Sequence, residues 1–198
     1  MPVEKTQRVQ GIDRAAHDTF VDWVAENPAA ATIEFSATGT TEDVAVHTKS
    51  TIGEFVMGEE ARGHDREYTI DVGLPAEMED AMGYVDPVDR CEAIELALAG
   101  LTACINGTVQ LNAMREGIAV EDVTTTVSVP FDPRVLLGIH DEDRAAEMLG
   151  DLDVEVQVTG ADLSEADIDR IKSFPRRSPV FNLLTRAHPT EPTVHVAT

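Results

Sequence analysis

Cys104 is the first residue whose type and setting indicate chemistry. It lies midway along an apolar stretch, GLTACING, with Gly100 four residues before it and Gly107 three residues after it. A cysteine thiolate is a nucleophile, although a lone cysteine on an apolar helix is more often a small residue of the core. Glycine inside a helix costs about 1 kcal/mol relative to alanine, so the flanking pair indicates close approach by another element.

Glu95 is the second candidate, an acid near the start of the same stretch. Nine residues separate it from Cys104, and at about 100° per residue the two side chains lie on opposite faces of a regular helix. They can line one pocket only if the helix begins after Glu95 or if a second subunit intervenes. The alternative role of Glu95 is a favourable interaction with the helix N-terminus.

Arg176 and Arg177 form the third candidate, two adjacent arginines in an acidic chain. A guanidinium group can hold a thiolate or a substrate anion, and the alternative is an ordinary surface ion pair. Ser178 follows them without a GxSxG motif, so we do not expect a hydrolase nucleophile. Cys91 lies 13 residues before Cys104 across a mostly helical span, which is too far for an intrachain disulfide.

The composition excludes several classes of partner. The 198 residues include 37 acidic and 15 basic side chains, for a formal net charge of -22, which argues against nucleic acid and against an anionic membrane surface. The six histidines are scattered and no CxxC or HExxH motif occurs, so we expect neither a metal site nor a bound cofactor. No charge-free stretch of about 20 apolar residues and no apolar signal core are present, which favours a cytoplasmic protein.

The charge also has a pattern. Acids are spread along the whole chain and only three basic residues are lysines, which indicates a halophilic protein adapted to a high-salt cytoplasm. An ordinary acidic protein is the alternative. The hydrophobic share of 42% is enough for one sizeable core.

Apolar periodicity predicts an α+β order of elements, not an alternating βαβ order. Asp13 caps an expected helix at about 13–27, and Ser164 begins another that buries Ile168 and Ile171. A short helix follows Pro179, and residues 74–92 are expected to form a loop. The expected strands are residues 31–37, 44–49, 51–57, 66–72, 123–129, 152–160 and 192–198.

The least polar stretch, EAIELALAGLTACINGTVQLNAMREG, predicts a helix of roughly 23 residues that ends near Gly117. Because it is apolar almost all round, we expect it to be the buried central helix.

Together these segments resemble the OsmC/Ohr family, the osmotically induced and organic-hydroperoxide-resistance proteins. The signals are AIELALAGLTACING around the cysteine, RRSPVFNLL where the family often has Cys-Pro-x-x-Asn, STIGEF, and GIAVEDV after the helix. The opening VQGIDRAAHDTFVDWVAENP is similar to a longer, divergent branch with an extra N-terminal helix.

The resemblance implies a single OsmC-like domain over residues 1–198, with antiparallel sheets around the long central helix and two intertwined subunits. It implies reduction of organic hydroperoxides, with Cys104 as the attacking cysteine and an external thiol as reductant. Ser178 stands at the position of the resolving cysteine, which is therefore missing. The rival expectation is a non-catalytic homodimer of this fold that binds a small apolar ligand at the subunit interface.

The sequence also departs from the family at the glutamate ten residues before the attacking cysteine. That position is Ile94, with Glu95 one step later. The activating arginine has three candidates, Arg62, Arg66 and Arg176. Attack requires the thiolate, so these departures weaken the expected activity and leave the expected fold unchanged.

The net charge of -22 predicts that the folded state depends on salt. At 0.01 M salt the Debye length reaches about 30 Å, so the acidic groups repel one another across the molecule. We expect the melting temperature to fall as KCl is lowered from molar to millimolar concentration, measured by circular dichroism. An unchanged melting temperature would refute the adaptation to high salt.

Overall fold

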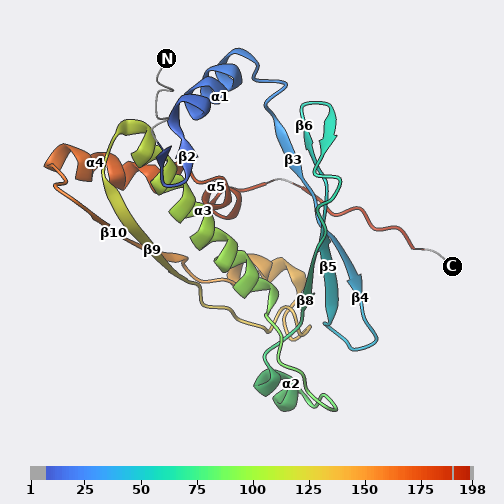
Figure 1. Cartoon of the computed structure of the whole chain (residues 1–198). Helices are drawn as coiled ribbons and strands as arrows, with labels where there is room; N and C mark the ends of the chain where they lie inside the picture. Colours follow the sequence, from blue (N-terminus) through green and yellow to red (C-terminus); the bar gives the residue numbers. More distant parts are fainter. Residues whose placement is uncertain (1–7, 189, 197–198) are drawn as a thin grey trace, which may run out of the picture. The chain divides into compact units, whose positions relative to one another are not determined.

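The computed structural model describes residues 8–188 and 190–196. The chain divides into two compact units, Met1–Glu95 and Leu96–Thr198, which are described separately. The helices and strands are drawn in Figure 1. The single domain over residues 1–198 stays a prediction.

The first unit consists of short antiparallel strands and two helices. Two three-stranded sheets have the orders β3-β6-β7 and β4-β5-β8, and β1 pairs with β2 as a hairpin. The elements are β1 Arg8–Val9, β2 Ile12–Asp13, α1 Arg14–Glu26, β3 Ile33–Phe35, β4 Thr38–Thr41, β5 Thr48–Ile52, β6 Phe55–Met57, β7 Glu60–Arg62, β8 Tyr68–Val72 and α2 Ala76–Met82.

Helix α1 is the helix predicted at about 13–27. Asp13 caps it, because the Asp13 carboxylate accepts from the backbone N–H of Ala16 at 3.1 Å. Its apolar face remains open, since Phe20 and Trp23 are 49% and 38% exposed. The local cap at Asp13 thus contributes to a helix whose apolar side chains are only partly covered.

Two expectations for the first unit were wrong. The strand expected at 44–49 is a turn followed by β5, because Val46 adopts a positive φ of 70° and Tyr84 donates its hydroxyl to the carbonyl of Ala45 at 3.0 Å. The loop expected at 74–92 contains α2, which ends at Gly83 in the left-handed conformation.

A buried hydrogen bond between a histidine and a carboxylate holds α2 in the first unit. The Nε2 atom of His47 lies 2.5 Å from Oε1 of Glu79, and the two side chains are 4% and 1% exposed. The other carboxylate oxygen accepts from the backbone N–H of Val88 at 2.8 Å. These contacts, the hydrogen bond with His47 first and that from Val88 next, lower the pKa of Glu79.

The second unit is built on one long helix. α3 spans Ala93–Glu116 and ends at Gly117, whose φ of 73° suits glycine, while the N–H of Ile118 donates to the carbonyl of Ala113 at 2.9 Å. The other elements are β9 Val120–Ser128, the 3₁₀ helix η1 Glu142–Glu147, β10 Asp153–Gly160, α4 Glu165–Ser173, the 3₁₀ helix η2 Phe174–Arg177 and α5 Pro179–Thr185.

Strands β9 and β10 form an antiparallel ribbon, with Val156 opposite Thr125. The ribbon is joined to α3 by a hydrogen bond from the Thr125 hydroxyl to Asn106 Oδ1 at 2.6 Å. Ser164 and Asp167 form the capping box at the start of α4, as the sequence indicated.

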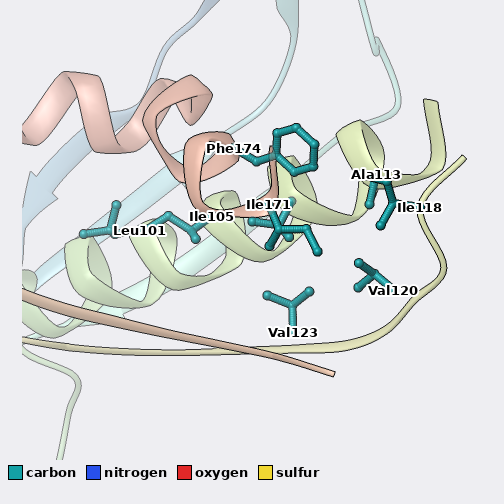
Figure 2. Close-up of a cluster of buried hydrophobic side chains, with 9 residues drawn as sticks. Leu101, Ile105, Ala113, Ile118, Val120, Val123, Ile171 and Phe174 are labelled. Carbon is teal, nitrogen blue, oxygen red and sulfur yellow. The ribbon is translucent and has the colours of Figure 1, made fainter. Parts of the chain in front are cut away.

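The core of the second unit lies along one stripe of α3. Leu101, Ile105, Val109 and Ala113 recur at every fourth residue, and each is at most 1% exposed. Figure 2 shows Ile171 and Phe174 facing this helix, with Val120 and Val123 on the strand side. Burying this set against the helix is the main apolar contribution to the unit.

Only that stripe and the last turns of α3 are buried, so a single chain does not make α3 the buried central helix that the sequence predicted. Leu111 on α3 is 37% exposed. By length and composition α3 could also cross a membrane, a test that core helices of soluble proteins pass as well.

Two further expectations for the second unit were wrong. Ile168 on α4 is 41% exposed and not buried. Residues 192–196 form no strand, and Val194 and Val196 are 78% and 80% exposed; residues 197 and 198 lie outside the described residues.

We predict that Glu79→Gln lowers the melting temperature by several degrees at neutral pH, because it leaves His47 without its carboxylate partner in a buried site. Folding lowers the pKa of Glu79, so the pair stabilises the fold above the pKa of a free glutamate, about 4.3, and this stabilisation is lost as pH falls through the lower folded value.

The control is Glu77→Gln, on an exposed acid of the same helix. Thermal melts between pH 3 and 7 should converge for wild type and Glu79→Gln only at the acid end. Equal losses in both variants at neutral pH would contradict a role for the buried pair.

Candidate functional site

Cys104 lies at the edge of the buried stripe of α3. Leu101 and Ile105, its neighbours along the stripe, are fully buried, whereas Cys104 is half-buried and its thiol is free. In the single chain the cysteine thus lies at the margin of the core and not inside it. A half-buried thiol on a rigid helix is accessible to a small reactant.

The face of α3 that carries Cys104 is open. Seven residues, close to two helical turns, separate Gly100 from Gly107, so both lie on the cysteine side of the helix. A methyl group added at either glycine would meet no atom within 4 Å. The close approach predicted from these glycines is therefore not made by the described residues of this chain.

Glu95 is part of the start of α3 and faces away from Cys104. Its carboxylate accepts from the backbone N–H of Glu92 at 2.9 Å, which is the alternative role considered for it. Because α3 begins at Ala93, the helix is regular from before Glu95 to beyond Cys104. The nine-residue spacing then puts the two side chains on opposite faces of one helix.

Arg177 is a structural residue of the second unit. Its guanidinium donates to Oδ1 of Asn112 at 2.5 Å, lies 3.6 Å from Oε1 of Glu116, and covers the ring of Phe174 at 5.2 Å. Asn112, 9% exposed, is the structural partner of Arg177, and the sequence did not single it out. Asn112 is one of three amide side chains on α3, with Asn106 and Gln110, and the sequence offers no signal that separates it from the other two.

Arg176 and Ser178 differ from each other in exposure. Arg176 is exposed and lines a cavity formed by residues 152–181, which does not include Cys104. Ser178 is 0% exposed, and its hydroxyl caps α5 by accepting from the backbone N–H of Phe181 at 3.2 Å. A local structural role thus accounts for the serine.

The other two candidate arginines lie in the first unit. Arg62 forms an ion pair with Glu60, and Arg66 lies over the rings of Phe55 and Tyr68 at 5.4 and 5.5 Å. Within the described ranges 8–188 and 190–196, no group of three or more His, Cys, Asp and Glu side chains could hold a metal ion.

A comparison with protein families decides which family this chain belongs to. A family model described as OsmC-like protein matches residues 89–193, more than half of the chain. The chain belongs to the OsmC-like family. The resemblance inferred from the segments around Cys104 and Arg176 is confirmed. A search of curated proteins finds no match.

Solved structures are also similar to this chain. An OsmC like protein from Mycoplasma pneumoniae is similar at 15% identity over 76% of this chain and 86% of that chain, with a TM-score of 0.50. An organic hydroperoxide resistance protein from Elizabethkingia anophelis is similar at 18% identity over 76% and 87%, with a TM-score of 0.46. Mixed α and β structure with antiparallel sheets and a long helix is thus established for this OsmC-like chain, as predicted.

The adjacent arginines provide a matched pair of variants. We predict that Arg177→Gln destabilises the protein by about 1–2 kcal/mol, because it removes the guanidinium that donates to Oδ1 of Asn112 and the ring contact with Phe174. Arg176→Gln should change stability by less than about 0.5 kcal/mol. Urea denaturation of both variants measures the difference, and equal losses would contradict the assignment.

Proposed function

We propose that this OsmC-like protein reduces organic hydroperoxides in the cytoplasm through Cys104. The observation that carries the proposal is a free, half-buried thiol on the open face of the long helix, in a chain of this family. Three of the similar solved structures carry the name organic hydroperoxide resistance protein. The family supports the activity that we propose for this chain. The exposure of the Cys104 thiol on α3 supports its sulfur as the reacting atom.

The reaction needs only the thiol and an external reductant. The thiolate of Cys104 attacks the terminal peroxide oxygen, the O–O bond breaks, and the alkoxide takes a proton to leave as the alcohol. The sulfur is then a sulfenic acid. One thiol of a dithiol reductant displaces water to form a mixed disulfide, and its second thiol releases Cys104 and leaves as a disulfide.

Ser178 explains why the reductant must come from outside. The position that carries the resolving cysteine in the family is a buried hydroxyl here, committed to capping α5. Glu95 is likewise committed to the start of α3, so we propose no catalytic role for it within its own chain. The activating cation stays open among Arg62, Arg66 and Arg176.

We further propose that the protein acts as a homodimer. Two observations support a dimer. One face of α3 is open, and the chain leaves large apolar side chains exposed, among them Phe35 at 68% and Tyr68 at 56%. A second copy of the chain offers the same surfaces, and the family resemblance implies that the long helices of two subunits pack together.

The catalytic proposal predicts consumption of cumene hydroperoxide with a dithiol reductant. Wild type should turn over and prefer this substrate to hydrogen peroxide, and Cys104→Ser should fall to the background rate. Cys91→Ser, which removes the other free thiol, should keep the wild-type rate and serves as the control. Background rates in the wild type would reject the enzyme and favour the rival, an interfacial site for a small apolar ligand.

For the replacement of Gly100 or Gly107 by alanine, helix propensity predicts a more stable protein, whereas the dimer proposal predicts a less stable one. In an isolated chain each change to alanine fills open space and should stabilise α3 by about 1 kcal/mol. If a second α3 packs on these glycines, Gly107→Ala should instead lower the melting temperature and weaken association, measured by light scattering across a dilution series. A stabilised variant with an unchanged mass would contradict helix packing at this face.

A further inference from the structure

A cavity of about 670 Å³ lies in the second unit, between strand β10 and the helices that follow it. Alternate residues of the strand, Val154, Val156 and Val158, form one side. Ile168 and Ile171 of α4 face them. The volume lies within the range of about 300–1,000 Å³ that is usual for small-molecule sites.

This cavity explains the exposure of Ile168. The helix periodicity predicted that Ile168 would be buried together with Ile171, but only Ile171 reaches the core. Ile168 forms part of the cavity wall. The apolar face of α4 is thus wider than the part that packs on the core, and the remaining part, with Ile168, lines the cavity.

Two cations lie at this apolar cavity, in a chain with a net charge of -22. Lys172 forms an ion pair with Asp169 at 3.2 Å. For the Arg176 guanidinium, no hydrogen-bond or ion-pair partner is found among residues 8–188 and 190–196. The one acid in the lining is Asp153 at the start of β10, so the charge of the lining is positive, opposite to that of the chain.

We propose that this cavity binds an amphipathic carboxylate, with its hydrocarbon chain between β10 and α4 and its carboxylate on Arg176. The planar guanidinium matches a carboxylate with two parallel hydrogen bonds, and Lys172 adds a second positive charge. The site is formed by residues 152–181 of one chain and excludes Cys104. The cavity is therefore apart from the thiol of Cys104.

Decanoate, decanol and decyltrimethylammonium are suitable probes, because they share a ten-carbon chain and differ in the charge of the head group. Titration calorimetry at one fixed salt concentration, on the full chain with Cys104→Ser, keeps the test independent of peroxidase activity. The acidic chain as a whole attracts the cationic probe, so a preference for decanoate would have to arise locally.

We expect one decanoate per chain and weaker binding of the other two probes. Arg176→Gln should weaken decanoate binding about tenfold, as loss of a charge-assisted hydrogen bond does. Arg186→Gln removes the same charge from an exposed position outside the cavity and should leave the affinity unchanged. Ile168→Asp, at a partly exposed position, should abolish decanoate binding by placing a carboxylate in the wall.

Three results would overturn the proposal: no saturable decanoate binding, equal affinities for decanoate and decanol, or equal losses in Arg176→Gln and Arg186→Gln. If Ile168→Asp does not fold, the two arginine variants still decide. Crosslinking that shows a second copy covering the cavity while decanoate fails to bind would assign it to an interface instead.

Discussion

The contact between one stripe of α3 and the elements that follow it determines the second unit. Leu101, Ile105 and Val109 fill the space above Phe174 and the β9–β10 ribbon, and this burial fixes the rotation of the helix about its axis. Once the rotation is fixed, the position of every other side chain on α3 follows from the helical repeat. Cys104 is consequently held at the edge of the core, half-buried and presented to the open face.

The two units are stabilised by different means. The second has a continuous apolar core, whereas the first buries a hydrogen-bonded His47–Glu79 pair and few apolar side chains. A buried polar pair is costly to desolvate and depends on every partner being present. Exposed apolar groups such as Phe35 leave this unit in need of further cover, in agreement with the proposed second copy.

Local signals in the sequence were sufficient for the long helix and for α4. Uniform apolar composition and Gly117 gave the extent of α3, and Ser164 with Asp167 gave the start of α4. Burial could not be predicted in the same way, because it depends on which elements pack on each face. The roles of Arg176 and Arg177 were also indistinguishable, since only the fold decides which of the two adjacent guanidinium groups reaches Asn112.

The central claim is that the packing of α3 presents Cys104, and not Cys91, as the reactive thiol. Mass spectrometry of the two cysteine peptides after one equivalent of cumene hydroperoxide tests it within a single molecule, because exposed Cys91 is the internal control. We predict that the peptide with Cys104 gains oxygen, or a thiol adduct if a thiol is present, while Cys91 remains reduced. Preferential oxidation of Cys91, or an unmodified Cys104 under excess peroxide, would contradict the account.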